Sequence, residues 1–281
     1  MSRFDLEIFC QAVEKYQPQR AHLVPPILVY LSKHPIVDKY DLSSLSMILS
    51  AAAPLSADVE NALEARIGCS IKQTWGISEL SPLATLCSDY NTWSGSVGQL
   101  VPNTYGKVVD PKGRILGPNH SGELMIKGPQ VMMGYLDDPE KTAECLSTDG
   151  WLRTGDVARY DEDGFFYITD RTKELIKVRA YQVAPAELEA LLLTHPLISD
   201  AAVIPVPDED SGELPRAYIV LKDGVKSEDA SGDDIKDWVK ERVVAYKRLD
   251  GGIHFIDEVP KSASGKILRR ILVDRVKAEE S

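Results

Sequence analysis

Short apolar stretches alternate with helical ones through the first quarter of the sequence, and this alternation constrains the fold more than any other feature. Three apolar stretches are typical of buried strands: AHLV (21–24), SLSMILS (44–50) and SIKQTWG (70–76). Around them we expect helices over 5–16 with an Asp5 cap, from Pro25-Pro26 onward, and over 56–68 with a Ser56 cap and a Gly68 end. Strand-helix-strand alternation predicts a parallel sheet, with ligand sites at the carboxyl ends of its strands.

The pattern changes twice further along the chain. Residues 95–130 contain short strands separated by Gly and Pro, followed by a helix over 138–146 and a hairpin around Asp163-Gly164. Beyond residue 170 we expect strands at 174–178, 201–206, 216–222 and 253–259 and helices at 184–195, 232–244 and 265–276. The acidic stretches 208–213 and 226–234 are interpreted as solvated loops.

These patterns predict an α/β plus α+β fold in two domains. Residues 1–170 form a large domain, with a partial parallel-sheet subdomain at 1–90 and a β-rich subdomain at 91–170. Residues 171–281 form a separate, small α+β domain, about a hundred residues being a normal domain size.

Composition excludes several classes of function. A net charge of −11 argues against nonspecific nucleic-acid binding, which needs a basic surface. The four cysteines show no C-x-x-C spacing, which favours reduced thiols, and the five histidines show no H-E-x-x-H metal motif. No apolar run reaches the ~20 residues of a transmembrane helix, and the charged start is no signal peptide, so we expect a cytoplasmic protein.

The stretch PKSASGKILRR (260–270) holds a Gly-Lys pair that invites comparison with a phosphate-binding loop. A P-loop requires Gly where Pro260 stands and Ser or Thr where Ile267 stands, so that interpretation fails. Two interpretations of Lys266 remain open on these residues alone. Either Ser264 caps a helix that Lys266 merely begins, or the lysine has a chemical function.

Five segments taken in order resemble the AMP-forming adenylate-forming superfamily, which includes acyl-CoA synthetases and 4-coumarate–CoA ligases. The segments are QTWGISE (73–79), GELMIKGPQVMMGY (122–135), WLRTGD (151–156), DRTKELIKVRAYQVAP (170–185) and PKSASGKILRR. SAAAPLS (50–56), DRTKELIK and YQVAP look most like the 4-coumarate–CoA ligase branch. The resemblance implies activation of an aryl, phenylpropanoid-like or medium-chain carboxylic acid with ATP, followed by transfer of the acyl group from AMP to CoA.

The resemblance also implies roles for residues of the first domain. Trp75 takes the position that stacks on adenine, Ser78 the position that contacts phosphate, and Glu79 the carboxylate that holds Mg²⁺. Asp156 matches the carboxylate that binds both ribose hydroxyls, while Gly76 and Gly155 allow close backbone approach or serve as turn glycines. Ala52, Gln73 and Thr74 are expected along the acyl-adenylate pocket.

In the second domain the resemblance implies two alternating poses, one per half-reaction. Lys173 matches the hinge and Arg171 a second ribose contact. Lys266 is expected to stabilise charge in adenylation and then withdraw, while Lys177 and Gln182 contact the adenylate. Arg179 and Ala180 lie where CoA contacts the loop; the family usually has Gly at the latter position.

One family segment is absent from this sequence, the Ser/Thr/Gly-rich loop that wraps the ATP β- and γ-phosphates. We therefore expect either an AMP-forming acyl-CoA ligase or, as the alternative, a catalytically incomplete module that binds nucleotide or acyl-AMP. The expected partners are a small carboxylic acid, ATP and CoA, together with a missing N-terminal half or a second copy of the chain. An adenylation domain that loads a carrier protein is a less favoured third reading, because no carrier-like domain follows.

Overall fold

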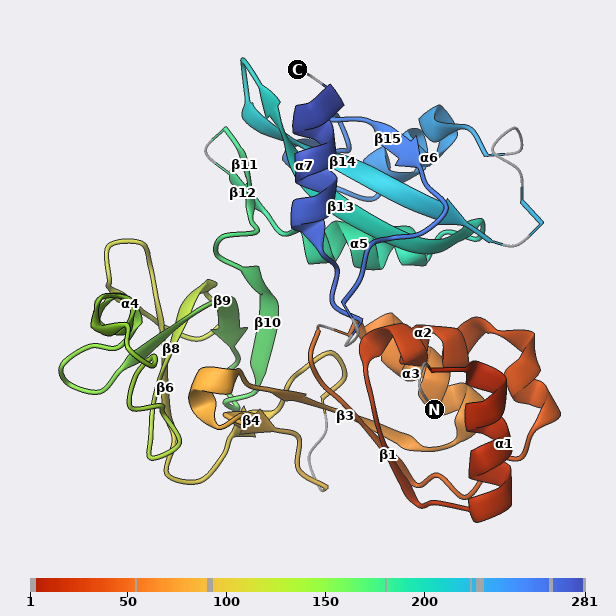
Figure 1. The fold of residues 1–281 in the computed structure, drawn as a ribbon, viewed down its shortest axis with the longest axis horizontal. Coiled ribbons are helices and arrows are strands. Elements are labelled where there is room, and N and C mark those ends of the chain that lie inside the picture. Colours follow the sequence, from red (N-terminus) through yellow and green to blue (C-terminus); the bar gives the residue numbers. More distant parts are fainter. Residues whose placement is uncertain are drawn as a thin grey trace. The chain divides into compact units, whose positions relative to one another are not determined.

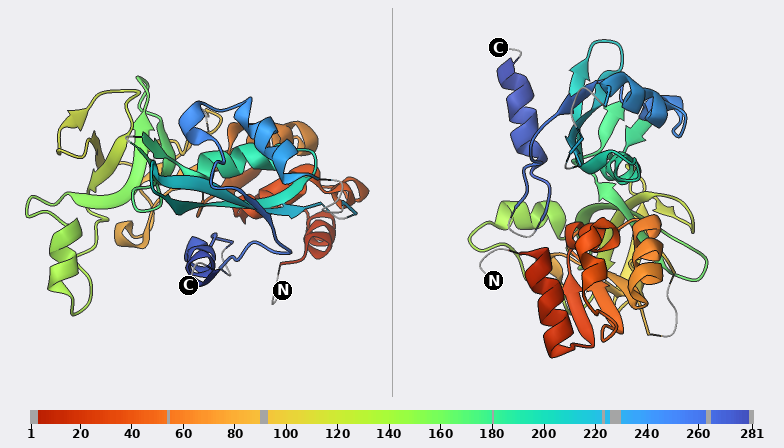
Figure 2. Two further views of the ribbon diagram at one scale, coloured as in Figure 1. Left: turned by 90° about the horizontal axis from the view of Figure 1, so that it is seen from above. Right: turned by 90° about the vertical axis from the view of Figure 1, so that its right-hand side faces the viewer.

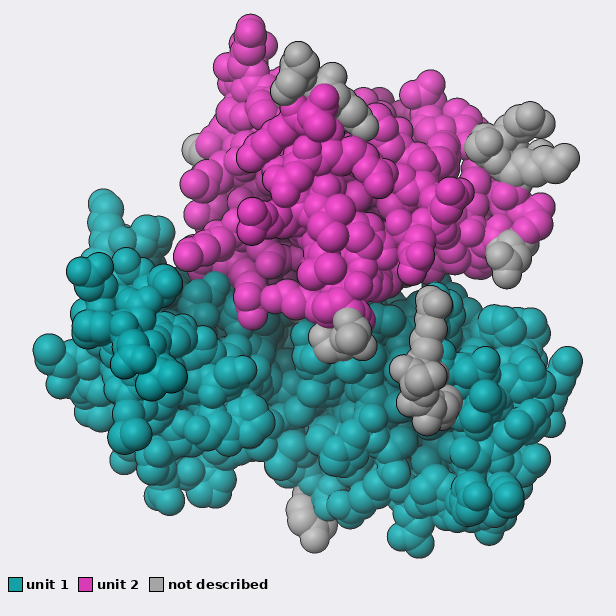
Figure 3. Space-filling view, in the orientation of Figure 1, with its two compact units in different colours: residues 1–168 teal, residues 169–281 magenta. Residues whose placement is uncertain are grey.

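The chain folds into two compact units (Figures 1 and 3). Unit 1 comprises residues 1–168 and unit 2 residues 169–281. The structure is a computed structural model, and it describes residues 4–53, 55–89, 93–179, 181–222, 224–225, 230–262 and 265–279. Each unit has its own hydrophobic clusters, so each is described by itself.

The first part of unit 1 is the predicted parallel sheet with helices packed on it. Its elements are α1 (Leu6–Tyr16), β1 (Arg20–Leu23), α2 (Pro25–Lys33), the 3-10 helix η1 (Pro35–Lys39), β2 (Met47–Ser50), α3 (Ala57–Ile67) and β3 (Ser70–Trp75). Strands β1, β2 and β3 pair in parallel, in that order. The predicted caps are confirmed, because Asp5 accepts a hydrogen bond from the Ile8 amide and Gly68 ends α3 with a left-handed φ of 76°.

The rest of unit 1 is rich in short antiparallel strands. Its elements are η2 (Ser78–Leu80), β4 (Thr85–Leu86), β5 (Gln99–Leu100), β6 (Tyr105–Val109), β7 (Ile115–Leu116), β8 (Gly122–Lys127), α4 (Pro139–Cys145), β9 (Leu152–Tyr160) and β10 (Phe166–Arg171). Strands β4 and β5 extend the first sheet, and the others form a second sheet in the order β10-β9-β8-β6-β7. The hydrophobic cluster of this part includes Trp75, Leu124 and Phe166. Trp75, the last residue of β3, thus packs into the core of the β-rich part.

Unit 2 is a sheet covered on both faces. Its elements are β11 (Ile176–Val178), β12 (Tyr181–Val183), α5 (Pro185–Leu193), β13 (Ile198–Asp208), β14 (Gly212–Leu221), α6 (Gly232–Lys240), η3 (Ala245–Lys247), β15 (Ile253–Phe255) and α7 (Arg269–Glu279). Along β13, Ala201 and Val203 face the α5 and α6 side, while Ala202 and Ile204 face α7. The view from above in Figure 2 shows α6 and α7 on opposite sides of this sheet.

Two predicted boundaries in unit 2 are wrong. The last helix was expected from residue 265 but begins at Arg269, because Ile267 is held in an extended bridge to Lys261. Only half of the acidic stretch 208–213 is a loop, since β13 ends at Asp208, β14 begins at Gly212 and the turn of this hairpin comprises residues 209–211. The mixed α/β architecture itself is as predicted. None of the helices in the described residues has the length and apolar character needed to cross a membrane, and the four cysteines are free thiols.

Candidate functional site

Trp75 and Asp156, both predicted to bind nucleotide, meet in the core of unit 1. Trp75 ends β3 and Asp156 lies in β9, 81 residues along the chain. The indole Nε1–H donates a hydrogen bond to Asp156 Oδ2 at 2.8 Å. Both residues are buried, Trp75 being 8% exposed and Asp156 5% exposed. The backbone amide of Asp156 donates a hydrogen bond to the Thr154 hydroxyl at 3.1 Å, which holds the backbone of Asp156 in place. The fold therefore orients Asp156 through an indole donor that the sequence did not reveal.

The two predicted site glycines are required for different local reasons. A Cβ atom on Gly76 would lie 1.7 Å from the Pro82 carbonyl oxygen, so no side chain fits there. Gly155 has a φ of 71° and open space around it, so its requirement is conformational. Gly76 permits close approach of the chain to itself, immediately after the tryptophan that contacts Asp156.

Glu79 lies in η2 and is held by Tyr135, a residue that the sequence reasoning did not single out. The Tyr135 hydroxyl donates to Glu79 Oε1 at 2.7 Å, and this hydrogen bond is the main reason why the pKa of Tyr135 rises to about 12. The amide of Met132 also donates to the Glu79 carbonyl at 2.8 Å. The only available signal was that Tyr135 ends the segment GELMIKGPQVMMGY.

Glu79 can serve as a magnesium ligand only together with ligands from a substrate. The described residues contain no group of three His, Cys, Asp or Glu side chains arranged to hold a metal ion. Mg²⁺ is commonly held by one or two carboxylates plus substrate phosphates, and one half-exposed carboxylate fits that role. Ser78, its neighbour at the start of η2, is exposed and can reach a ligand from the same turn.

The residues predicted to line the acyl pocket differ in burial and in the hydrogen bonds that their side chains make to the protein. Gln73 is buried, and its amide nitrogen donates to the Leu55 carbonyl at 3.1 Å and to Glu60 Oε2 at 2.9 Å. The Thr74 hydroxyl donates to the Thr85 carbonyl at 2.5 Å. Ala52 is exposed with a left-handed φ of 79°, a conformation that non-glycine residues rarely adopt.

Glu60 is a buried acid that the helical pattern of residues 56–68 did not reveal. It is 4% exposed, and besides the Gln73 amide it accepts a hydrogen bond from the Gly95 backbone at 2.9 Å. Burial raises the pKa of the Glu60 carboxyl. The Gln73 side chain is therefore held in the interior of unit 1 by Leu55 and Glu60.

The predicted residues of unit 2 include two that face one another across a hairpin. Lys177 in β11 is the register partner of Gln182 in β12, and both are exposed. Arg179 occupies the turn with a φ of 54°, as two-residue hairpin turns require, and Ala180 lies outside the described residues. The Lys177 amide donates to Glu213 at 2.7 Å, which joins the hairpin to β14. Arg171 and Lys173 are exposed just before this hairpin.

Lys266 lies on a short loop three residues before α7. Its amide donates to the Ser262 hydroxyl at 3.2 Å and its carbonyl accepts from the Ser262 amide at 2.9 Å. Ser264, the predicted helix cap, lies outside the described residues. The lysine is therefore not part of the helix, so the interpretation of Lys266 as merely the first turn of a helix is wrong.

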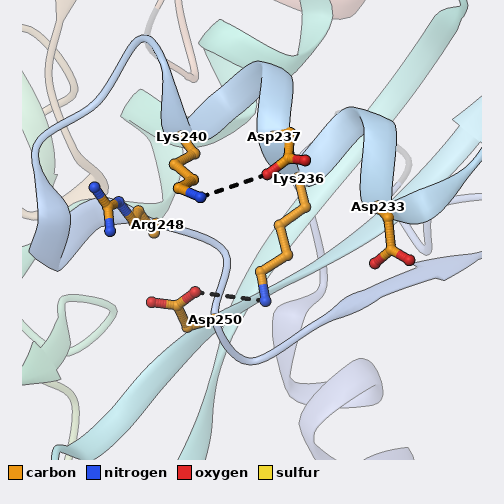
Figure 4. Close-up of a pocket in the computed structure, with 6 residues that line it drawn as sticks. All are labelled: Asp233, Lys236, Asp237, Lys240, Arg248 and Asp250. Atoms are coloured by element: carbon orange, nitrogen blue, oxygen red, sulfur yellow. Dashed lines mark ion pairs between the residues drawn. The ribbon is translucent and has the colours of Figure 1, made fainter.

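A separate pocket of about 500 Å³ in unit 2 contains none of the predicted residues (Figure 4). It is lined by Asp233, Lys236, Asp237, Lys240, Arg248 and Asp250. Lys236 pairs with Asp250 at 3.5 Å and Lys240 with Asp237 at 3.7 Å. Its three cations and three carboxylates balance, so the lining has no net charge with which to select an ion.

Comparison with known proteins gives a family match in each of the two units. Residues 1–136 match the family described as AMP-binding enzyme, and residues 187–266 match the AMP-binding enzyme C-terminal domain. The chain is 44% identical over 285 residues to 4-coumarate:CoA ligase 1 of Petunia hybrida, covering 99% of this chain and 52% of that protein. It is 43% identical over 277 residues to the probable 4-coumarate–CoA ligase 1 of Dictyostelium discoideum, covering 98% and 50%.

Solved structures resemble the whole described fold. The anthranilate CoA ligase AuaEII in complex with anthranoyl-AMP matches with a TM-score of 0.89 and 28% identity, over 98% of this chain and 53% of that one. The o-succinylbenzoate CoA synthetase MenE from Bacillus subtilis, in complex with its acyl-adenylate intermediate, matches with a TM-score of 0.81 and 28% identity, over 96% and 54%. The chain thus spans about half the length of the relatives it matches, and it belongs to the AMP-binding, adenylate-forming enzyme family.

Proposed function

We propose that this chain provides the adenylate-binding and acyl-transfer half of an AMP-forming acyl-CoA ligase that activates an aryl or medium-chain carboxylic acid. The observation that carries the proposal is the buried hydrogen bond from Trp75 to Asp156, which joins two predicted nucleotide contacts from distant parts of the chain. An ionised carboxylate accepts two hydrogen bonds from vicinal hydroxyls, and an indole offers a broad face to a purine. The site is thus suited to the nucleoside part of AMP.

Eight further predicted residues are each assigned to one of the two half-reactions according to their chemistry. Ser78 and Glu79 are proposed to contact the α-phosphate side, with Glu79 as the protein ligand to Mg²⁺, which when bound neutralises phosphate charge. Lys266 is proposed to stabilise the charge that builds on phosphate oxygens while the carboxylate attacks. Lys177, Gln182 and Arg179, with Arg171 and Lys173 before them, are proposed to act on the adenylate, the hinge and CoA in the second half-reaction.

The proposal is tested by two assays on the purified chain. With ATP, Mg²⁺, CoA and a panel of carboxylic acids, pyrophosphate should be released with at least one acid. In parallel, AMP should bind in calorimetry, and Asp156→Ala should weaken AMP more than it weakens 2′,3′-dideoxy-AMP, since only AMP offers ribose hydroxyls. Equal weakening of the two nucleotides would contradict the assignment of Asp156.

A second candidate function is a nucleotide- or acyl-AMP-binding module that does not turn ATP over. It is motivated by the residues present, because the predicted nucleoside contacts Trp75 and Asp156 meet within unit 1. Calorimetry separates the two candidates. A module of this kind should bind AMP and ATP with similar affinity, whereas much tighter binding of ATP than of AMP would exclude it.

A further inference from the structure

The loop that carries Lys266 is closed at its base by backbone hydrogen bonds. Leu268 N–H donates to the Pro260 carbonyl at 2.8 Å, and Lys261 and Ile267 form an antiparallel bridge. Gly265 N–H donates to the Ser262 carbonyl at 2.8 Å. The loop thus has two arms that run side by side before and after Lys266, one leaving Pro260 and one leading into α7.

Each arm carries a cation that is paired with a carboxylate of the α5–β13 layer. On the first arm Lys261 Nζ lies 2.5 Å from Asp200 Oδ2 in β13, with both side chains 22% exposed. On the second arm Arg269 pairs with Glu189 of α5 at 2.7 Å and also with Glu174, and its side chain is 15% exposed. Two attachment points on opposite arms restrict rotation of the loop, whereas one would leave a pivot.

The carboxylates that receive these cations are themselves fixed by the backbone. Glu189 Oε1 accepts a hydrogen bond from Val203 N–H at 2.8 Å, and Asp200 Oδ1 accepts from Ala201 N–H at 3.0 Å. Arg269 contacts Glu189 through two guanidinium nitrogens, at 2.7 and 3.2 Å, which is the planar two-point pairing that guanidinium favours. The attachment points are therefore rigid parts of unit 2.

We propose that Lys261 and Arg269 are positioning residues that fasten both arms of the Lys266 loop to the α5–β13 layer of unit 2. The two sets of ion pairs then hold the base of the loop, on either side of Lys266, against the rest of unit 2. The role of Lys266 in this statement rests on the proposed function, but the fastening of the loop does not. The chemistry of the attachment is ionic and partly buried, so it persists at salt concentrations that screen surface pairs.

The fastening is tested by hydrogen exchange on the full chain. The peptide spanning 259–268 contains the amides of Gly265, Lys266 and Leu268, whose hydrogen bonds close the loop. Lys261→Met and Arg269→Met should each raise its exchange rate about tenfold, because local opening controls exchange. Arg270→Met is the matched control: its side chain is 91% exposed and pairs with Asp274 of the same helix at 3.6 Å, so exchange should stay at the wild-type rate.

A second measurement separates positioning from general stabilisation. Pyrophosphate release from ATP and acid reports the half-reaction assigned to Lys266, and thioester formation from presynthesised acyl-AMP and CoA reports the other. Arg269→Met should lower the ratio of the first rate to the second about tenfold, Arg269→Lys should recover part of it, and Arg270→Met should leave it unchanged. A variant that only destabilises unit 2 would lower both rates together.

Three outcomes would overturn the inference. If the 259–268 peptide exchanges at the wild-type rate in both Lys261→Met and Arg269→Met, the cations do not fasten the loop. The same conclusion would follow if exchange became faster evenly over residues 169–281. An unchanged ratio of half-reactions would show that fastening does not position Lys266. If Arg269→Met fails to fold, Lys261→Met and Asp200→Asn decide by the same exchange criterion. If the wild-type chain releases no pyrophosphate, the proposed function fails. The hydrogen-exchange rates of the 259–268 peptide still test whether Lys261 and Arg269 fasten the loop.

Discussion

At the scale of single residues, the chemistry of this chain depends on side chains that are oriented by partners far away in sequence. Trp75 is the clearest case, because its indole N–H reaches Asp156 across the core of unit 1. Tyr135 holds Glu79 in the same way, from the segment after β8. A residue assigned to a ligand by pattern alone is thus incompletely described until its protein partner is known.

Trp75→Phe should reveal the orienting role of the indole. The substitution keeps an aromatic face but removes the donor, and a hydrogen bond to a charged group contributes about 1.5–3 kcal/mol, part of which the retained packing offsets. AMP affinity should fall about fivefold, or about 1 kcal/mol, and the affinity of 2′,3′-dideoxy-AMP should change little. Calorimetry measures both; Trp93→Phe, at a tryptophan that is 53% exposed, is the control. Equal losses for the two nucleotides would mean that Trp75 acts only by stacking.

Lys266→Ala should separate the two half-reactions. Removing one preorganised contact to developing charge typically costs on the order of 10²–10³ in rate, so pyrophosphate release should fall by about that factor. Thioester formation from presynthesised acyl-AMP and CoA should be nearly unaffected. Lys177→Ala should show the reverse pattern, slowing thioester formation more. Rapid-quench assays of each half-reaction measure the two rates, and equal slowing of both by Lys266→Ala would contradict the assignment.

At the scale of secondary-structure elements, the end of β3 places Trp75, and the turn that follows this strand leaves little room. Gly76 follows β3 directly, and its backbone packs against the Pro82 carbonyl so closely that no Cβ fits. The turn after β3 therefore fixes both Trp75 before it and η2 after it. In unit 2, α5 supplies Glu189 and α7 supplies Arg269, so one buried ion pair ties two helices together.

Gly76→Ala should destabilise unit 1 for a steric reason alone. The Cβ would lie 1.7 Å from a backbone oxygen that cannot move without shifting the turn, and overpacking of this severity typically costs about 2–4 kcal/mol of unfolding free energy. Gly117→Ala is the matched control, because nothing lies within 4 Å of its Cβ and its φ is ordinary. Urea unfolding followed by intrinsic fluorescence gives both values. A loss below about 1 kcal/mol at Gly76 would show that the turn adapts.

Glu189 should make the stability of unit 2 depend on pH. Burial raises its pKa from the ordinary 4.5 to about 7, even though Arg269 beside it acts in the opposite direction. Glu189 is therefore mainly protonated below about pH 7 and mainly ionised, as the partner of Arg269, above it. The folded state therefore binds this proton more tightly than the unfolded state does. The corresponding stability is fully present below pH 4.5 and is lost as pH rises through 7.

The measurement is the unfolding free energy of wild type and of Glu189→Gln between pH 5 and 8. Gln keeps an acceptor for Val203 N–H but cannot titrate. Wild-type stability relative to the variant should fall by about 1–3 kcal/mol over that range. Since Asp170 and His195, whose pKa values are also shifted, titrate in both proteins, only the difference between the two curves is informative. A flat difference would mean that Arg269 keeps Glu189 ionised throughout.

The sequence predicted elements well where one local rule determined them and poorly where a distant contact did. The capped helices α1 and α3 followed from Asp5, Ser56 and Gly68 alone. The start of α7 did not, because Lys261 pairs with Ile267 and holds Ile267 in an extended conformation outside the helix. Likewise Glu60 and Glu189 lie on helices whose patterns suggest solvated acids, and only the tertiary fold shows that they are buried.

At the scale of the whole molecule, two bodies of different architecture each contain part of the predicted chemistry. The nucleotide residues Trp75, Glu79 and Asp156 lie in unit 1, and Lys177, Gln182 and Lys266 in unit 2. No hydrophobic cluster of described residues includes members of both units. Clusters confined in this way predict that each unit folds as a separate cooperative unit.

Scanning calorimetry of the full chain should therefore show two thermal transitions, and the variants already described assign them. Gly76→Ala should lower only the transition temperature of unit 1. For a unit of this size, a loss of about 2 kcal/mol in unfolding free energy lowers that temperature by roughly 4–8 °C. Glu189→Gln should change only the transition of unit 2, and the sign of its effect should depend on pH. At pH 8 the wild type has an ionised carboxylate buried beside Arg269, and at pH 5.5 a largely neutral one. The wild-type transition of unit 2 should thus shift downward, relative to the variant, as pH rises. A single transition that both substitutions move together would show that the two units unfold as one cooperative unit.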